Sequence, residues 1–387
     1  MTRPLALVMG DVDMVRALGL AGISSALFGF ADEAGRYSRH VRALLPWIDH
    51  WERQDDVAAA LVTFAETQDE PPVLFPQTDA AVLLASRHRE ALGARMRLAL
   101  ADAELIDQLM DKSRFQALAA ERGLPVPRAQ ELRAGLGEQT PELDVPFPLV
   151  VKPIVRTPGW TRLAGGRKAL SVPDDASFAT LWPQLADVGT SLLAQELVLG
   201  PESAIESFHA YVDAGGAVAG AFTGRKIRTY PLDYGHSSAV EVVDLPYVAE
   251  LGRDVLARLG LTGVAKLDFK RDDRGRLHLL EINPRFNLWH HPGAVAGVNL
   301  PAMVYADLTG GRRPPTVPAP RSVAWCDPLL DVRAARAAGV PMLQWVGWLR
   351  GCEAFCGLAW ADPLPFLRGR LAPAMWRRVT DSPRAAS

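Results

Sequence analysis

Residues 263–286 read GVAKLDFKRDDRGRLHLLEINPRF, and this stretch decides the fold that we expect for the chain. Residues 264–270 and 277–283 each alternate between apolar and polar side chains, which is the period of a β-strand. Between them lies the polar turn of residues 272–275, Asp-Asp-Arg-Gly. Two alternating runs around a glycine-containing turn are typical of a β-hairpin.

We take residues 274–275 as a two-residue loop, and the symmetry of an antiparallel ladder then fixes the pairing. Asp268 faces Glu281, and Lys266 faces Asn283. The two carboxylates and the asparagine therefore fall on one side of the ribbon. On the other side, toward a core, we expect the apolar residues Leu267, Phe269, Leu280 and Ile282.

Two carboxylates that face each other across a ladder repel, and a cation between them removes the repulsion. Asp268, Glu281 and Asn283 offer oxygen ligands, and lysines lie nearby in the sequence. Such a set suits Mg²⁺ that carries a polyphosphate. The alternative, from the spacing alone, is an exposed hairpin whose charges are solvated.

Residues 281–285, Glu-Ile-Asn-Pro-Arg, follow a strand that bears Asp268, and together they resemble the ATP-grasp ligases. Within that superfamily the resemblance is to the carboxylate-amine ligases related to D-aspartate ligase, and it extends over residues 5–310. It implies an α/β and α+β protein in which a Rossmann-like pre-ATP-grasp domain precedes the ATP-grasp fold and a C-terminal extension follows it. It also implies ATP and Mg²⁺ as cofactors, with Mn²⁺ as an alternative. Asp268, Glu281 and Asn283 would hold the metal, and Arg285 would face the transferred phosphoryl group or the substrate.

The scarcity of lysine is a second, independent indication. Of the 42 lysines and arginines only six are lysines, all in the middle of the chain: Lys112, Lys152, Lys168, Lys226, Lys266 and Lys270. A chain that otherwise uses arginine is expected to keep lysine where a compact ammonium is needed. A codon bias would explain the scarcity but not the clustering.

The composition of the whole chain limits its function. With 387 residues, of which 49% are hydrophobic, more than one domain is expected. The net charge of -2 argues against a nucleic-acid or membrane-surface partner, and no apolar run is long enough for a spanning helix. We therefore expect a cytoplasmic protein that acts on small molecules, with a homodimer left open. Its three cysteines are expected to be free thiols.

The first hundred residues predict an open α/β sheet. Residues 5–9, 12–19 and 23–28 read as strand, helix and strand, and a third strand covers residues 73–75. Gly10 lacks the partners of a G-x-G-x-x-G turn, so dinucleotide binding is not supported.

Thr78 and Asp79 follow the third predicted strand directly. Either residue could only cap the next helix. The carboxyl edge of such a sheet also binds ligands, so both are candidates for the substrate site.

Lysines in the second quarter of the chain match positions that contact the phosphates of ATP in the resembling ligases. Lys112 begins a helix, and Lys152 ends the apolar strand PLVVKP; an exposed lysine is the alternative for Lys112. Lys168 closes residues 156–168, which lack periodicity and resemble the mobile loop that covers the phosphates.

Residues 192–202, LLAQELVLGPE, read as a strand, a linker and an acid. An apolar linker with free backbone groups can hold an adenine edge. By the resemblance Glu202 contacts the ribose, and the adenine-binding residues are Gln195, Glu196, Leu197 and Val198.

Two further strands, at residues 206–211 and 217–223, lead into the cations Lys226 and Arg228. We interpret these cations as an anion cradle with a catalytic role; the alternative is a solvated loop. His290 and His291 have no identifiable partner and are expected to lie behind the site.

Taken together, the sequence predicts ATP-dependent conversion of a carboxylate to an acyl phosphate, followed by attack of an amine, with ADP and phosphate as products. A bicarbonate-activating enzyme and a non-catalytic ATP-binding regulatory protein are the two alternatives. The expected domains are the pre-ATP-grasp domain at 1–108, the N-terminal lobe at 109–190, the C-terminal lobe at 191–310, and the linker with the extension at 311–387.

Overall fold

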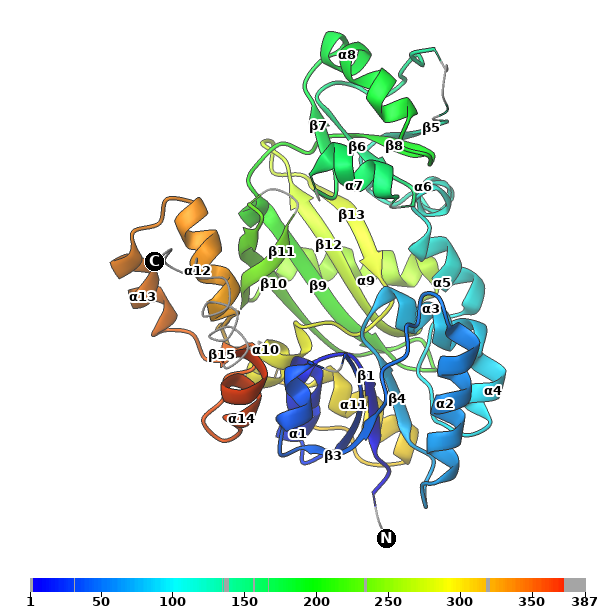
Figure 1. The fold of residues 1–387 in the computed structure, drawn as a ribbon, viewed down its shortest axis with the longest axis vertical. Coiled ribbons are helices and arrows are strands. Elements are labelled where there is room, and N and C mark those ends of the chain that lie inside the picture. Colours follow the sequence, from blue (N-terminus) through cyan, green and yellow to red (C-terminus); the bar gives the residue numbers. More distant parts are fainter. Residues whose placement is uncertain are drawn as a thin grey trace, which may run out of the picture.

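The structure is a computed structural model that describes residues 3–30, 32–133, 135, 139–155, 157–165, 167–232, 235–317 and 321–371. Its strands form three sheets with helices packed against them (Figure 1). This agrees with the α/β and α+β class expected from the sequence. Within the described ranges, no helix has the length and apolar character needed to span a bilayer.

The first sheet is parallel, with the strand order β3-β2-β1-β4. Its strands are β1 (Ala6–Met9), β2 (Ser25–Phe28), β3 (Val41–Leu45) and β4 (Val73–Pro76). Three of them are buried along their whole length, which explains their continuous apolar sequences. The predicted strand-helix-strand opening is confirmed, but β3, whose burial alternates, is absent from the prediction. The helices here are α1 (Val12–Leu20), α2 (Gln54–Glu66), α3 (Asp79–Arg87), α4 (Arg89–Gly93), α5 (Ala103–Met110) and the 3₁₀ turn η1 (Ala34–Tyr37).

The second sheet is antiparallel and has the order β5-β8-β6-β7. It contains β5 (Ala129–Leu132), β6 (Leu149–Pro153), β7 (Leu170–Val172) and β8 (Leu192–Glu196). Helices α7 (Pro158–Ala164) and α8 (Asp175–Ala186) pack on it, and α6 (Lys112–Glu121) precedes it. Its core includes Trp160, Phe178 and Trp182.

The expectation of an aperiodic loop over residues 156–168 is wrong, because α7 forms there. The Thr157 side chain caps the helix by accepting from the Trp160 N–H at 3.1 Å, and Gly165 ends it with φ 59°. Trp160 is almost completely buried, so one large apolar side chain orders a segment that shows no period. Arg156 and Gly166 lie outside the described residues.

The third sheet has seven strands in the order β13-β12-β9-β10-β11-β14-β15. They are β9 (Ile205–Val212), β10 (Val218–Tyr230), β11 (His236–Val242), β12 (Gly263–Arg271), β13 (Leu277–Asn283), β14 (Val323–Cys326) and β15 (Ala354–Phe355). Helix α9 (Pro246–Leu259) shares a core with one face of this sheet. Residues 224–228, considered above as a loop, are part of β10.

The C-terminal extension adds two strands to this third sheet. β14 pairs with β11, and β15 pairs with β14, and residues of both strands belong to the core that the first and third sheets share. Its helical elements are α12 (Pro328–Ala337), α13 (Met342–Leu349), α14 (Leu364–Phe366) and a π-helical turn at Leu367–Leu371.

The hairpin of β12 and β13 has the predicted key pairs but a different loop. Its turn closes between Asp272 and Arg276, with Gly275 at φ 79°, so the two-residue loop is wrong. The longer turn shifts the ladder by one residue, and a bulge between Asp268 and Phe269, with Leu280 as the extra residue, shifts it back. Asp268 therefore pairs with Glu281, and Lys266 with Asn283, as predicted. The bulge also exchanges two leucines: the buried core residue is Leu279, whereas Leu280 is only half-buried.

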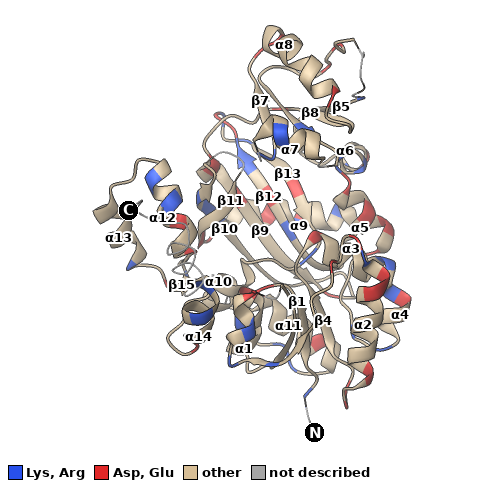
Figure 2. Ribbon diagram, viewed as in Figure 1, with Lys and Arg blue, Asp and Glu red and all other residues tan. Residues whose placement is uncertain are grey.

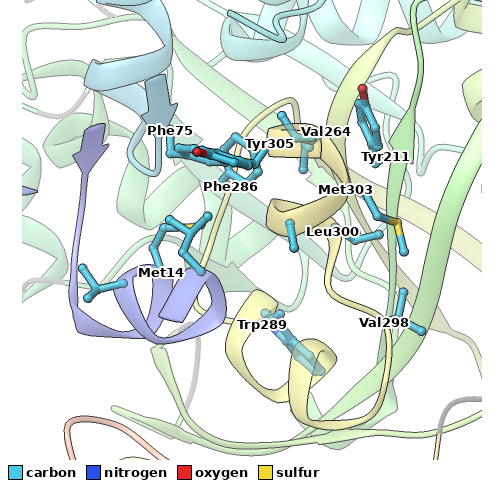
Figure 3. Close-up of a cluster of buried hydrophobic side chains, with 14 of the residues drawn as sticks. Met14, Phe75, Tyr211, Val264, Phe286, Trp289, Val298, Leu300, Met303 and Tyr305 are labelled. Atoms are coloured by element: carbon cyan, nitrogen blue, oxygen red, sulfur yellow. The ribbon is translucent and has the colours of Figure 1, made fainter. Parts of the chain in front are cut away.

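The first sheet and the third share a hydrophobic core, which fixes the first domain against the hairpin. Figure 3 shows Phe75 of β4 beside Phe286, and their ring centroids are 5.1 Å apart. Met14 of α1 and Trp289 belong to the same core. The helices α10 (His290–Val295) and α11 (Leu300–Thr309) complete it.

The predicted domain divisions after residues 108, 190 and 310 stay predictions. The first falls inside α5, and β8, which begins just after the second, pairs with β5 and β6 in the second sheet.

Candidate active site

Asp268 lies at the centre of the candidate site. β12 places it between Ser207 on β9 and Glu281 on β13, and its side chain is almost completely buried. The Ser207 hydroxyl donates to Asp268 Oδ1 at 2.5 Å, and Lys266 Nζ donates to Oδ2 at 2.5 Å. Lys226 Nζ is 4.0 Å from the same oxygen. Burial alone would raise the pKa of Asp268, but the two lysines and these hydrogen bonds hold it below its ordinary value.

Glu281 and Asn283 follow two residues apart on β13. Asn283 Nδ2 donates to Glu281 Oε1 at 3.1 Å, and the Glu281 side chain is exposed. Across the described residues no group of three or more His, Cys, Asp or Glu side chains could hold a metal. The predicted set has two carboxylates and one amide. Its oxygens, next to lysines, fit a cation such as Mg²⁺ that keeps several waters and binds phosphates as well.

Lys152 and Lys112 meet at the end of β6. Lys152 Nζ donates to Gln195 Oε1 at 2.7 Å, and Lys112 Nζ donates to the carbonyls of Pro153 and Ile154 at 2.5 and 2.9 Å. Burial lowers the pKa of Lys152, and the positive charge of Lys112 lowers it further. The nearby carboxylates of Glu281 and Glu202 act in the opposite direction but do not cancel the shift. An anion beside these two ammonium groups would relieve their repulsion.

Lys226 on β10 faces the hairpin and interacts electrostatically with Asp268, Glu281 and Glu202. Burial alone would lower its pKa, but the three carboxylates raise it. The second and third sheets therefore contribute to one group of charges, the charge cluster, which consists of Lys112, Lys152, Lys226, Lys266, Glu202, Asp268 and Glu281. Figure 2 shows acidic and basic positions side by side on β12 and β13.

Of the predicted adenine-binding residues, Gln195 and Glu196 end β8, and Leu197 and Val198 follow it. The Glu196 N–H donates to the Arg128 carbonyl at 2.8 Å and the Leu197 N–H to the Pro148 carbonyl at 3.0 Å. Adenine recognition by this segment would therefore depend on its carbonyls and on Val198. Gln195 has a further role, since its side chain holds Lys152. Lys168 lies exposed between α7 and β7.

Arg285 connects the hairpin to the carboxyl edge of the first sheet. Its guanidinium donates to the Asp79 carboxylate, to the Gln77 carbonyl at 3.1 Å and to Asn283 Oδ1 at 3.2 Å. Thr78 is a helix cap, because its hydroxyl accepts from the Ala81 N–H at 3.2 Å. Asp79 is thus joined to the predicted site by a direct contact.

Arg228 is held away from this group by the C-terminal extension. Its guanidinium makes a bidentate pair with Asp331 of α12 and lies 4.1 Å from the ring centroid of Trp348. Asp331 is completely buried and also accepts from Ser238 and Trp345 at 2.7 and 2.8 Å. These contacts give Arg228 an anchoring role in the structure.

Several neighbours of the site are missing from the sequence prediction. Ser207 contacts Asp268 across β9 and β12, which are far apart in the chain, so no local pattern indicates it. Asp11 caps α1 and exchanges two hydrogen bonds of 2.8 Å with the Gln77 side chain. Burial, and then Asp13, raises the pKa of Asp11 to about 6; burial, and then Asp11, raises that of Glu33 to about 7. The available signal was Asp11, an acid two residues beyond the carboxyl end of a strand in an open sheet.

The two histidines after the hairpin are both buried. His290 is completely buried beside Phe286, and burial lowers its pKa to about 3. His291 Nδ1 lies 2.9 Å from the Asp13 carboxylate.

Comparisons with known proteins place this geometry in a known fold. Residues 192–328 match the family described as "ATP-grasp in the biosynthetic pathway with Ter operon". The D-alanine–D-alanine ligase of Halorhodospira halophila is 28% identical over 184 residues, which are 45% of this chain and 56% of that protein. The chain thus spans about half the length of the curated relatives it matches.

Solved structures agree over a longer range. An L-amino acid ligase from Bacillus licheniformis matches with a TM-score of 0.61 at 15% identity, over 84% of this chain and 79% of that one. A biotin carboxylase from Campylobacter jejuni matches with a TM-score of 0.63 at 13% identity, over 84% and 76%. The solved structures therefore share the fold of this chain, and the family match over residues 192–328, which include the hairpin, confirms the expected ATP-grasp fold there.

Proposed function

We propose that the protein is an ATP-dependent carboxylate-amine ligase that forms ADP. The observation that carries the proposal is the charge cluster around the hairpin, with Arg285 joining the end of the hairpin to the first sheet. The similarity to ligases that join amino acids supports an amino-acid-like carboxylate. An acyl phosphate path needs alignment and charge neutralisation more than a side-chain nucleophile.

Each part of the cluster has a role in this proposal. Asp268, Glu281 and Asn283 would hold Mg²⁺, which supplies charge neutralisation to the phosphates when bound. Lys112 and Lys152 would bind the phosphates, and Lys226 and Arg285 would stabilise the charge that develops on the transferred group. The residues assigned to adenine and ribose are Gln195, Glu196, Leu197, Val198 and Glu202.

In the first step a carboxylate oxygen of the substrate attacks the γ-phosphorus, and the bond to the β,γ-bridging oxygen breaks to release ADP. In the second step the amine nitrogen attacks the acyl carbon and loses a proton, and phosphate leaves with one former carboxylate oxygen. The bond formed is an amide or peptide bond.

The test is ADP release by the full chain with ATP, Mg²⁺ and amino acids supplied singly and in pairs. With the active acid labelled with ¹⁸O in its carboxylate, the label should appear in inorganic phosphate. Label in AMP, with pyrophosphate, would show an adenylating ligase and contradict the proposal. ADP release that requires bicarbonate instead of an amino acid would favour the carboxylase alternative, whose fold is shared by the biotin carboxylase match.

A further inference from the structure

An aromatic cluster lies at the carboxyl edge of the first sheet. Phe28 ends β2, and Phe30, Trp47 and His50 lie on the segments that follow β2 and β3. The ring centroids of Phe30 and Trp47 are 4.0 Å apart, and those of Trp47 and His50 are 4.8 Å apart. We call Phe28, Phe30, Trp47 and His50 the edge aromatic cluster.

Part of this region remains open to solvent. Phe30 is 60% exposed although it stacks on Trp47, and Trp51, next to His50, is also 60% exposed. Two large exposed aromatics at a ligand-binding edge offer apolar surface that a bound group could cover.

A chain of contacts joins the edge aromatic cluster to the candidate active site. His50 Nε2 is 3.4 Å from the Thr78 hydroxyl, and the next residue, Asp79, binds Arg285. β2 and β4 are separated by β1 alone, so their carboxyl ends lie about 10 Å apart. The edge aromatic cluster is therefore connected to Arg285 through His50, Thr78 and Asp79 along the carboxyl edge of the sheet.

His50 provides an independent indication of a ligand. It is only 7% exposed, and its Nδ1 has no hydrogen-bond partner in the part of the chain that the structure describes. A buried polar atom without a partner is costly unless another group reaches it. The ring lies against Trp47, so that group would enter beside the edge aromatic cluster.

We propose that one substrate of the ligase is an aromatic amino acid whose ring packs on Phe30 and Trp51. The inference rests on the proposed function, because it assigns the substrate class of the same site. A flat ring can stack on Phe30 and cover Trp51, whereas a methyl side chain leaves both exposed. The expected preference for an aromatic over a small side chain is on the order of 10-fold in kcat/KM.

The experiment compares ADP release by the full chain with amino-acid pairs that contain phenylalanine, tyrosine or tryptophan and with the same pairs in which alanine replaces the aromatic member. Phe30→Ala and Trp51→Ala should raise KM for the aromatic pair about 10-fold and leave the alanine pair unchanged. Trp360→Ala is the matched control, since Trp360 is 96% exposed in the C-terminal extension, and it should change neither. Equal kcat/KM for aromatic and alanine pairs, or no effect of Phe30→Ala, would overturn the inference.

Calorimetric binding of phenylalanine and of alanine separates this inference from the proposed function. If no pair releases ADP, the proposed function fails, and the substrate class is decided by binding alone. Phenylalanine that binds the wild type but not Phe30→Ala would support the aromatic site, whereas phenylalanine that binds no better than alanine would overturn it.

Discussion

At the scale of single residues, the site depends on charges that differ in exposure. Asp268 is buried and already neutralised by lysines, whereas Glu281 opposite it is exposed and carries one amide hydrogen bond. Removing the charge of Glu281 should therefore affect cation binding with little effect on folding.

Glu281→Gln tests the metal assignment. The amide keeps the shape of the side chain but removes a negative charge from the cation site. Loss of a residue that supports a metal ligand typically lowers metal affinity about 10-fold to 100-fold. Loss of a ligand itself should cost at least as much, so the apparent Mg²⁺ affinity in ADP release should fall at least about 10-fold. Circular dichroism should show an unchanged fold, and Glu250→Gln on the exposed side of α9 serves as the control. An unchanged Mg²⁺ titration in the folded variant would contradict the assignment.

Lys152→Arg tests the role of the rare lysines. Lys152 is confined at the end of β6 against Gln195, and a guanidinium is larger and cannot reproduce the point charge. Loss of a charge-assisted hydrogen bond costs about 1.5–3 kcal/mol, so ATP affinity measured by calorimetry should fall about 10-fold or more. Arg336→Lys on α12 is the control. Wild-type affinity in Lys152→Arg would show that the lysine distribution carries no functional information.

At the scale of elements, the C-terminal extension is part of the third sheet. β14 and β15 continue it beyond β11, and Asp331 of α12 collects hydrogen bonds from β10, β11 and α13. A buried carboxylate with this many donors holds together elements that come from distant parts of the sequence.

Asp331→Ala should destabilise the protein strongly. It leaves Arg228, whose side chain is only 13% exposed, without its charged partner, which costs about 3–5 kcal/mol. Asp254→Ala breaks an exposed pair with Arg258 within α9 and should cost less than about 0.5 kcal/mol. Urea unfolding of both variants measures the difference. Equal and small effects would mean that α12 is only loosely held.

The same elements show what the sequence could and could not predict. The pairing of Asp268 with Glu281 was predictable because alternation restricts the register. The bulge between Asp268 and Phe269 was not predictable, since it compensates a turn whose length the residues alone do not determine. Ser207 was not predictable either, because the β9–β12 pair joins strands separated by a helix and a further hairpin.

Arg228 shows a different reason why the role of a residue could not be predicted from the sequence. From the sequence it belongs with Lys226 as a cation beside the site, since the two residues follow closely after a predicted strand. In the structure the register shifts between these two residues, and Arg228 pairs with α12. A partner about a hundred residues away decided its role, and no local pattern carries that information.

At the scale of the whole molecule, the first domain is joined to the rest by a shared core and by charge. The core that contains Phe75 and Phe286 lies behind the carboxyl edge of the first sheet (Figure 3). Asp11 and Glu33 lie at that edge with raised pKa values, near 6 and 7. The stability of the whole protein should therefore depend on pH in a range where the charge of Asp268 is constant.

This pH dependence has a definite sign. The folded state holds protons on Asp11 and Glu33 more tightly than the unfolded chain does, so their contribution to stability is fully present below about pH 4 and is lost as pH rises through about 6 to 7. Asp268 has a lowered pKa, and its contribution is lost only in stronger acid. The free energy of unfolding should therefore fall between pH 5 and pH 8, by about 1 kcal/mol after allowance for partial exposure.

Glu33→Gln assigns this loss to the edge of the first sheet. Glu33 Oε1 accepts from the Val12 and Gly35 N–H groups at 3.2 and 3.1 Å, and the glutamine oxygen can keep both hydrogen bonds while the charge is removed. The variant should be more stable than the wild type at pH 8, similar to it at pH 5, and flatter in between. The raised pKa of Asp11 has its own causes, burial and then Asp13, so a smaller pH dependence near pH 6 should remain in the variant. Urea unfolding at several pH values measures this, with Glu52→Gln on an exposed loop as the control. A wild type that gains stability from pH 5 to pH 8, or a Glu33→Gln variant with an unchanged slope, would show that these carboxylates are solvated in the folded protein.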